Sequence, residues 1–260
     1  MTDHLADYAH LTDIAERRRI EGDEFFICEG PQALDRLISS GHHIRSVILI
    51  DTKADRVLAE LTTPLSESIP IFRVARAEMN AIVGFDLHRG VIASANRKPT
   101  PGPSEVEAII DRSRRIAVLE GLNDPENLGA IARSAHALSI DAIICDPTCI
   151  DHYTRRTVRV SMGEILHMPV IRTTGSDHLA QLLAGWETWA LTPNPQADDI
   201  WSLELPERLA LILGAEGPGL DRRTISGATR AVRIPITPGV DSLNVGNAAA
   251  VAFAIATRPH

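Results

Sequence analysis

Short apolar runs alternate with helical patterns through the second half of the chain, and this alternation constrains the fold more than any other feature. Five segments predict strands: 115–120, 141–146, 188–193, 209–214 and 231–236. Helical patterns lie between and after them, at 128–139, roughly 153–162, 177–185 and 246–257. Because the strand segments are apolar almost throughout, they favour strands covered on both faces, as in a parallel sheet. We therefore expect an open α/β sheet, whose ligands bind beyond the carboxyl ends of its strands.

The first half of the chain shows a similar alternation. Strands are expected at 24–30, 46–51, 69–75 and 90–95, and "PQALDRLISSG" (31–41) predicts a helix between Pro31 and Gly41. Between the halves, "NRKPTPGPSE" (96–105) has no apolar periodicity and is typical of a linker. We expect two α/β domains, 1–95 and 106–260, joined by this linker.

Composition and charge exclude several classes of protein. No apolar run is long enough to span a bilayer, and the N-terminal residues do not resemble a signal peptide. Cys28, Cys145 and Cys149 are too few for a disulfide framework and are expected to be reduced thiols of a cytoplasmic protein. The ten histidines show no metal-binding spacing, so no metal is expected. Because no apolar run is long enough, a membrane is not expected as a partner either. The net charge of -8 still allows a local basic patch that binds nucleic acid.

The segment "LALILGAEGPGLD" (209–221) is a predicted strand that opens into a loop with three glycines and one acid. No phosphate loop of the form G-x-x-x-x-G-K-[ST] occurs in the chain, and no G-x-G-x-x-G follows the strand at 115–120. Glu216 would also repel a polyphosphate. Glycine lets a ligand approach the backbone closely, so a ligand with a neutral or cationic face fits this loop best. An ordinary turn is the alternative interpretation.

Two further segments carry polar residues beside helical patterns. In "NDPENLGAIARSAHAL" (123–138), Asn127 falls at the expected helix N-terminus, where it could be a cap. Arg133 lies off the apolar stripe, where it is either simply exposed or approached by a substrate. In 234–256, Ser242 and Asn244 precede an alanine-rich helix, which predicts close packing against another element.

Taken together, these three segments resemble the SpoU branch of the SPOUT superfamily, the TrmH-like RNA 2′-O-ribose methyltransferases. The resemblance rests on three motifs in order, and it runs from the linker to the C-terminus. They are "NLGAIAR" with Asn127, Gly129 and Arg133, then Gly214, Glu216, Gly217, Gly219 and Leu220, then Ile234, Pro235, Ser242, Leu243, Asn244 and Val245. Many members continue S-L-N-V-S, whereas Gly246 and Asn247 follow Val245 here.

The resemblance implies a parallel sheet with a deep C-terminal trefoil knot, a homodimer and S-adenosyl-L-methionine as cofactor. It implies that backbone around Gly214, Gly219, Ile234 and Leu243 holds the cofactor. The residues that match the family's catalytic positions are Arg133, Asn127, Glu216, Ser242 and Asn244. "FFICEGPQALDRLI" gives the N-terminal half a likeness to the ribosomal-protein-like, RNA substrate-binding domain that many members carry.

The implied reaction is attack of a ribose 2′-hydroxyl of tRNA or rRNA on the activated methyl group. Because a guanidinium stays protonated, we expect Arg133 to hold a phosphate and stabilise the forming alkoxide. Arginine clusters are the candidates for RNA contact, with exposed structural residues as the alternative: Arg17, Arg18, Arg19, Arg155, Arg156 and Arg159. The rival functions are a non-catalytic RNA-binding or ribosome-assembly module that keeps the cofactor pocket, and a nicotinamide oxidoreductase that lacks the usual fingerprint.

Overall fold

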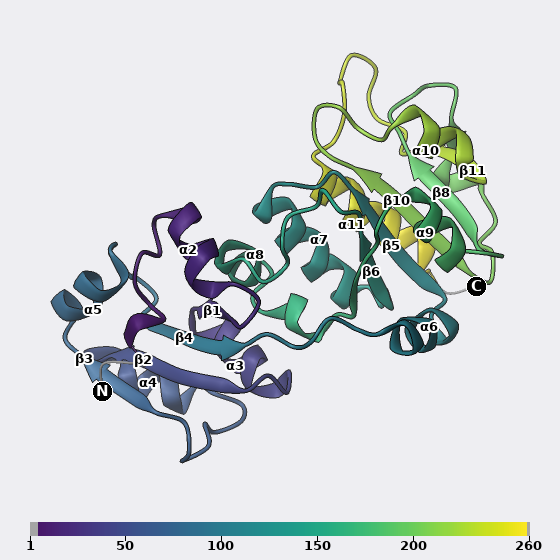
Figure 1. The fold of residues 1–260 in the computed structure, drawn as a ribbon. Coiled ribbons are helices and arrows are strands. Elements are labelled where there is room, and N and C mark those ends of the chain that lie inside the picture. The colour runs from purple at the N-terminus through teal and green to yellow at the C-terminus, as the bar shows by residue number, and fades with distance from the viewer. Residues whose placement is uncertain (1–4, 259–260) are drawn as a thin grey trace. The chain divides into compact units, whose positions relative to one another are not determined.

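The computed structural model describes residues 5–258, and the chain divides into two compact units (Figure 1). Unit 1 comprises the residues up to Pro99 together with Tyr153–His167. Unit 2 comprises Thr100–His152 and the residues from Met168 onward. Segment 153–167 therefore belongs to unit 1, which differs from the expected assignment of all residues from 106 to 260 to one domain.

Unit 1 contains a four-stranded sheet with the order β1-β4-β2-β3. Strand β4 is antiparallel to both β1 and β2, and β3 is parallel to β2. The strands are β1 (Phe25–Glu29), β2 (Ile44–Ile50), β3 (Ile71–Val74) and β4 (Val91–Asn96). The helices are α2 (Ile14–Glu21), α3 (Pro31–Ser39), α4 (Asp51–Ala59) and α5 (Arg76–Val83). In α3 the predicted apolar stripe is buried through Ala33, Leu34 and Leu37.

Segment 153–167 forms α8 (Arg155–Val160) and the 3-10 turn η1 (Glu164–His167), and it packs on unit 1. Between α8 and η1, a Cβ on Gly163 would lie 3.1 Å from the carbonyl oxygen of Ala33. The hydroxyl of Tyr153 lies 3.1 Å from His42 Nε2 and accepts a hydrogen bond from the backbone N–H of Lys98 at 3.2 Å. These contacts join residues that are far apart in sequence, so local periodicity could predict the helix but not the unit that it packs on.

Unit 2 contains a seven-stranded sheet with the order β7-β6-β5-β10-β8-β11-β9, and every pairing in it is parallel. This confirms the α/β parallel sheet expected from the apolar runs. The strands are β5 (Arg115–Glu120), β6 (Ala142–Cys145), β7 (Val170–Arg172), β8 (Glu187–Leu191), β9 (Asp198–Asp199), β10 (Leu209–Gly214) and β11 (Arg230–Arg233).

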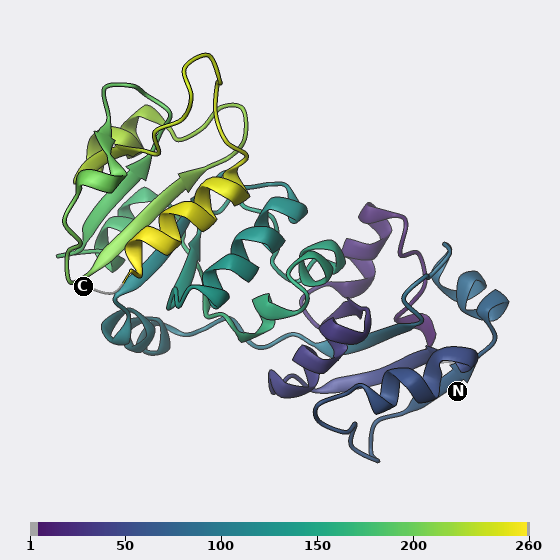
Figure 2. The same cartoon turned by 180° about the vertical axis from the view of Figure 1, so that it is seen from behind.

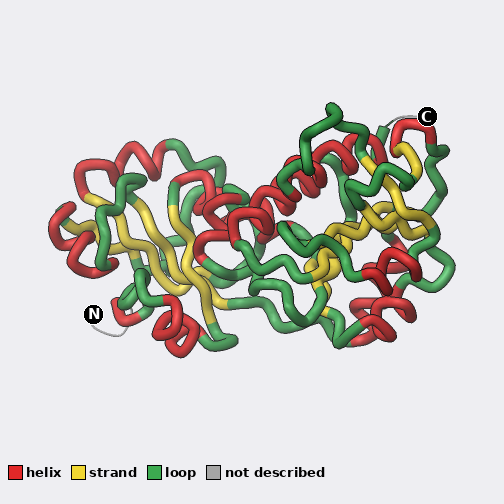
Figure 3. Tube along the Cα trace, turned by 90° about the horizontal axis from the view of Figure 1, so that it is seen from above, coloured by secondary structure: helices red, strands yellow, loops and turns green. Residues whose placement is uncertain are grey.

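Helices cover the sheet of unit 2, as Figures 2 and 3 show. They are α6 (Pro103–Arg112), α7 (Pro125–Ala137), α9 (Ser176–Leu182), α10 (Arg222–Gly227) and α11 (Val245–Ala256), with the short turn η2 (Ile200–Ser202). Side chains of α6, α9 and α10 share one core with alternate residues of the strands, such as Ile116, Val118 and Ile212. Helices α7 and α11 pack against each other, and α11 also contacts β10.

Helix α6 begins inside the segment expected to be a linker. Its first residue is Pro103, directly after Gly102. Proline is favoured in the first turn of a helix, so this Pro/Gly pair marks a helix start as well as a loop. The irregular stretch between β4 and α6 is thus 97–102, shorter than the expected 96–105.

The strand order of unit 2 reverses between β5 and β10. From β5 the chain adds β6 and β7 on one side, whereas β10 and β8 lie on the other side. In open α/β sheets ligands bind outside the carboxyl ends of the strands at such a reversal. The segments that leave this edge are 121–124, which enters α7, and the glycine loop 215–220, which enters α10.

Candidate active site

The glycine loop leaves β10 and doubles back on its own start. Ala215 and Gly219 pair as an isolated antiparallel bridge, and the N–H of Gly219 donates to the carbonyl of Ala215 at 3.1 Å. A Cβ on Gly214 would lie 2.4 Å from the carbonyl carbon of Gly219, so only glycine fits there. Gly217 and Gly219 have φ of +88° and +68°, and a Cβ on either would meet nothing within 4 Å. The loop is therefore tightly folded and offers bare backbone to open space.

Asn244 joins the three motif segments. Its Nδ2 donates to Asn127 Oδ1 at 2.9 Å and to Glu216 Oε1. Its Oδ1 accepts from the N–H groups of Gly246 at 2.9 Å and Asn247 at 3.2 Å, so Asn244 is also the N-cap of α11. One side chain thus connects the start of α7, the glycine loop and the start of α11.

Close packing of α7 against α11 holds this arrangement in place. A Cβ on Gly246 would lie 3.2 Å from the Cβ of Ala130 and 3.1 Å from Asn244 Oδ1. The serine that many family members carry at this position is thus replaced by a residue without a side chain at a crowded contact. The small residues of α11 are explained by this packing within one chain, as for an ordinary buried helix.

The other predicted site residues take no part in the hydrogen bonds that link Asn127, Glu216 and Asn244. Ile234 directly follows β11, and Leu243, which is 39% exposed, precedes Asn244. Ser242 and Arg133 are exposed, and neither side chain has a hydrogen bond or ion pair with any residue from 5 to 258. A rotation of about 100° per residue puts Arg133 and Asn127 on different faces of α7, about 9 Å apart along the axis.

One functional candidate was missed from the sequence. Glu120, the last residue of β5, accepts hydrogen bonds from the N–H of Asp221 at 2.6 Å and from the hydroxyl of Thr224. It stands just before "GLNDP" and matches none of the three motifs. The only sequence signal was an acid at the end of a buried strand, which is weak by itself.

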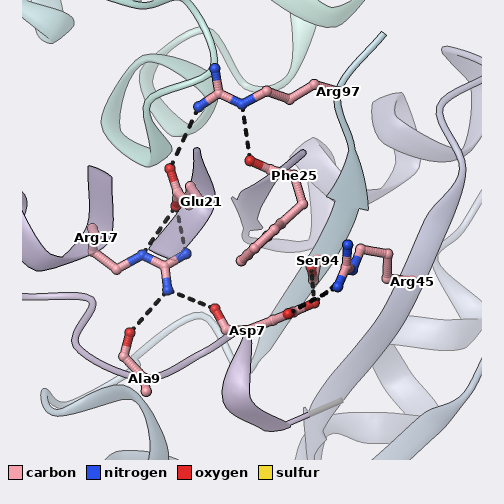
Figure 4. Close-up of polar contacts among 8 residues, drawn as sticks. All are labelled: Asp7, Ala9, Arg17, Glu21, Phe25, Arg45, Ser94 and Arg97. Carbon is pink, nitrogen blue, oxygen red and sulfur yellow. Dashed lines mark hydrogen bonds and ion pairs between the residues drawn. The ribbon is translucent and has the colours of Figure 1, made fainter. Parts of the chain in front are cut away.

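The structure corrects the expectation that Arg17 contacts RNA (Figure 4). Arg17 is 7% exposed, and its Nη1 donates to the carbonyl oxygens of Asp7 and Ala9 at 2.7 and 2.9 Å. Its Nε donates to Glu21 Oε1 at 3.1 Å. A guanidinium occupied in this way is a structural residue that ties the N-terminal segment to α2.

Two acids complete this polar cluster. Asp7 pairs with Arg45 at 2.9 Å and accepts from the hydroxyl of Ser94 at 2.6 Å. Glu21 also faces Arg97, whose Nε donates to the carbonyl of Phe25 at 3.0 Å. The neighbours of Arg17 on α2 differ from it: Arg18 is exposed, and Arg19 is an exposed partner of Glu16. Of the first basic cluster, Arg18 and Arg19 remain candidates for RNA contact.

The second basic cluster divides in a similar way. Arg155 donates to the buried carboxylate of Glu29 at 2.6 Å, and its guanidinium lies 4.6 Å from the ring centre of Phe85. Arg159 lies 3.5 Å from the same carboxylate, whereas Arg156 is exposed. Arg155 therefore attaches α8 to β1, which favours the structural alternative for this residue over RNA contact, and Arg156 remains a candidate.

The comparison with known families agrees with this geometry. The model of the SpoU rRNA Methylase family matches residues 114–254, which include the glycine loop, Asn127 and Asn244. The chain belongs to the SpoU rRNA methylase family. This confirms the membership expected from the three motifs.

Among residues 5–258, no helix is long and apolar enough to cross a membrane.

Curated relatives match the chain beyond the region of the family model. An uncharacterized tRNA/rRNA methyltransferase of Mycobacterium tuberculosis is 39% identical, over 98% of this chain and 88% of the relative. The 23S rRNA (guanosine-2′-O-)-methyltransferase RlmB of Photobacterium profundum is 28% identical, over 83% of this chain and 89% of the relative.

Solved structures share the fold. An AdoMet-bound rRNA methyltransferase from Sinorhizobium meliloti aligns with a TM-score of 0.77 at 23% identity, over 98% of this chain and 94% of that one. The SpoU methyltransferase AviRb from Streptomyces viridochromogenes, in complex with AdoMet, aligns with a TM-score of 0.77 at 19% identity, over 99% and 97%.

Proposed function

We propose that this SpoU family member transfers a methyl group from S-adenosylmethionine to a ribose 2′-hydroxyl of tRNA or rRNA. The observation that carries the proposal is the amide of Asn244, which binds both Asn127 and Glu216 where β5 and β10 end. Three segments from distant parts of the chain are thereby assembled at the point where the strand order reverses. The ribose 2′-oxygen as acceptor is supported by the name of the RlmB relative.

The glycine loop fits this cofactor. Because Gly217 and Gly219 have no side chains, an adenosine can approach the loop backbone closely, and the open space beside these two residues leaves room for one. The loop's charged side chain is the acid Glu216, which suits a sulfonium cation and not a polyphosphate. Backbone around Gly214, Gly219, Ile234 and Leu243 would hold the molecule. When bound, it supplies an electrophilic methyl group, so the protein's task is mainly positioning.

The chain's own residues orient the nucleotide and manage charge. Arg133 stays protonated and therefore cannot accept the proton of the 2′-hydroxyl. Its guanidinium, which is exposed and has no partner among residues 5–258, suits an RNA phosphate and the negative charge that develops on the attacking oxygen. The hydroxyl of Ser242 is also exposed, has no hydrogen bond with the described residues, and can meet the nucleotide. The hydrogen bonds among Asn127, Glu216 and Asn244 fix the positions of the three segments that carry the site residues.

The proposal includes a homodimer formed through unit 2. Arg133 has no partner among residues 5–258, and Val240 and Leu243 are 53% and 39% exposed beside Ser242. Large apolar side chains that remain exposed next to a site are typical of an interface. It also includes a trefoil knot made by the C-terminal segments, and an RNA-binding role for unit 1 as a ribosomal-protein-like domain. With tRNA or rRNA as substrate, the protein works in the cytoplasm.

A transfer assay tests the proposal. Purified protein is incubated with S-adenosylmethionine labelled in the methyl group and with unmodified tRNA or unmodified rRNA. We expect label in one RNA pool. Arg133→Ala should lose transfer while binding the cofactor within about threefold of wild type, because Arg133 acts on RNA charge and not on the cofactor. The matched control is Arg112→Ala, which removes an exposed arginine from α6 and should retain transfer.

Two results would contradict the proposal in different ways. Cofactor binding without transfer to either pool would favour the non-catalytic RNA-binding module. Loss of cofactor binding in Arg133→Ala would show that the assigned role of this residue is wrong.

A further inference from the structure

Glu120 stands at the base of the glycine loop. It is the last residue of β5, and in the ladder between β5 and β10 it lies opposite Gly214, the residue at which the loop begins. The backbone of this acid is therefore fixed beside the start of the loop. Its side chain is half-buried at the carboxyl edge of the sheet.

The carboxylate of Glu120 holds the other end of the loop. Its Oε1 accepts from the N–H of Asp221 at 2.6 Å, and its Oε2 accepts from the hydroxyl of Thr224. Asp221 is in turn the N-cap of α10, because its carboxylate accepts from the N–H of Arg223 at 2.7 Å. One residue thus joins the point where the loop leaves β10 to the point where it enters α10.

Leu220 and a backbone bridge also hold this end of the loop. Leu220 is 8% exposed and reaches the core of unit 2, and the bridge between Ala215 and Gly219 closes the turn. On the opposite side, Glu216 is bound by Asn244. Gly217, Pro218 and Gly219 are exposed between these anchors. The conformation of the exposed backbone therefore depends on both of its anchored ends.

We infer that Glu120 is a positioning residue that holds the glycine loop in the conformation that binds the cofactor. The inference rests on the proposed function, because it takes this loop as the cofactor site. A loop fixed before binding loses less conformational entropy when the ligand arrives, so its affinity is higher. Glu120 touches no reacting atom, and its effect is on cofactor affinity and not on the chemical step.

A structural cap of α10 is the competing explanation, and cofactor affinity separates the two. Glu120→Ala removes both hydrogen bonds, whereas Glu120→Gln keeps an acceptor for Asp221 and offers an amide N–H to the oxygen of Thr224. The matched control is Glu187→Ala. Glu187 accepts from Trp189 Nε1 at 3.1 Å and Arg230 Nε at 2.9 Å, but it lies where the strands begin, opposite Leu209.

The experiment is calorimetric titration of the full chain with S-adenosylmethionine, with the Tm measured without ligand. We expect Glu120→Ala to bind about tenfold more weakly or worse, which corresponds to about 1.4 kcal/mol. Glu120→Gln should bind within about threefold of wild type, and Glu187→Ala should lower the Tm without changing affinity. In the transfer assay Glu120→Ala should raise KM for the cofactor and leave kcat almost unchanged.

Wild-type affinity in Glu120→Ala would overturn the inference, as would equal weakening in Glu187→Ala or no rescue by Glu120→Gln. If Glu120→Ala does not fold, Thr224→Val carries the test, since it removes one of the two bonds and should weaken binding in the same direction. A wild-type protein that binds no S-adenosylmethionine would contradict the proposed function itself, which is a different result.

Discussion

At the residue scale, the glycine loop can fold back on β10 only because Gly214 has no side chain. Gly214 has room for a hydrogen only, since a Cβ would lie 2.4 Å from the backbone of Gly219. We expect Gly214→Ala to open the turn and to abolish measurable binding of S-adenosylmethionine by calorimetry. Gly227→Ala is the control, because Gly227 ends α10 and a Cβ there would meet nothing within 4 Å. Unchanged affinity in Gly214→Ala would show that the loop does not form the cofactor site.

Asn244 provides a second prediction at this scale. In Asn244→Asp, the cap of α11 survives, but the donor to Asn127 and Glu216 becomes an acceptor. Loss of the two hydrogen bonds and repulsion between two exposed carboxylates should lower the free energy of unfolding at pH 7 by about 1 kcal/mol. The repulsion should also raise the pKa of the introduced aspartate in the folded state, so the folded variant binds more protons than the unfolded chain as the pH falls.

The loss in Asn244→Asp should therefore shrink as the pH falls from 7 towards 4. Urea unfolding across this range measures the effect, with Asn247→Asp as the control on the same helix turn. A loss that stays constant with pH would contradict the assigned geometry around Glu216.

The sequence motifs indicated which residues could form the candidate site but not how they are arranged. Asn127, Glu216 and Asn244 were expected together, and one amide joins them. Arg133 and Ser242 match the same motifs but form no hydrogen bond or ion pair with any of these three. Glu120 could not be predicted as a site residue, because its hydrogen bond is to the backbone N–H of Asp221, 101 positions away. Such a contact leaves no periodic or motif signal.

At the scale of single elements, α2 shows that adjacent arginines can have opposite roles. Arg17→Ala would remove the ion pair with the buried Glu21 and the hydrogen bonds to the carbonyls of Asp7 and Ala9, and we expect a loss of about 3 kcal/mol in the free energy of unfolding. Arg18→Ala should leave the Tm unchanged and weaken RNA binding, with a salt dependence lower by about one phosphate contact. Thermal unfolding and RNA binding at several salt concentrations measure both. Equal effects of the two variants on RNA affinity, without loss of stability, would contradict this division.

Elements with strong apolar patterns were predictable, and charged or very short ones were not. The strands at 115–120 and 209–214 lie where expected because their runs are buried on both faces. Helix α2 has the sequence "IAERRRIE", in which few apolar residues mark a stripe, and β9 has only Asp198 and Asp199. The beginning of α6 was hidden because Gly102 and Pro103 suit both a loop and a helix start.

At the scale of the whole molecule, each of the two units is built from segments that are not continuous in sequence. Segment 153–167 leaves unit 2, packs on β1 and α3, and then returns. A fragment that begins at Thr100 would lack the partners of Tyr153, Val158 and Leu166, which are buried in the full chain. We expect protease to cut this fragment first within 153–167, and to leave the rest of unit 2 protected.

Limited proteolysis with mass spectrometry tests this expectation. The control is the full chain, in which the same segment should resist cleavage. Early cuts spread over β5, β6 and β10 would contradict the description of unit 2 as a compact body with its own core.

If the protein methylates a ribose 2′-oxygen as proposed, the position of the transferred methyl group in the RNA will show it. RNA labelled by the protein is hydrolysed in alkali, and the labelled product is identified by mass spectrometry. A 2′-O-methyl group removes the nucleophile that alkali uses to cleave the next phosphodiester. We therefore expect a labelled, alkali-resistant dinucleotide that is absent when Arg133→Ala replaces wild type. Label recovered in a mononucleotide with a methylated base would contradict it.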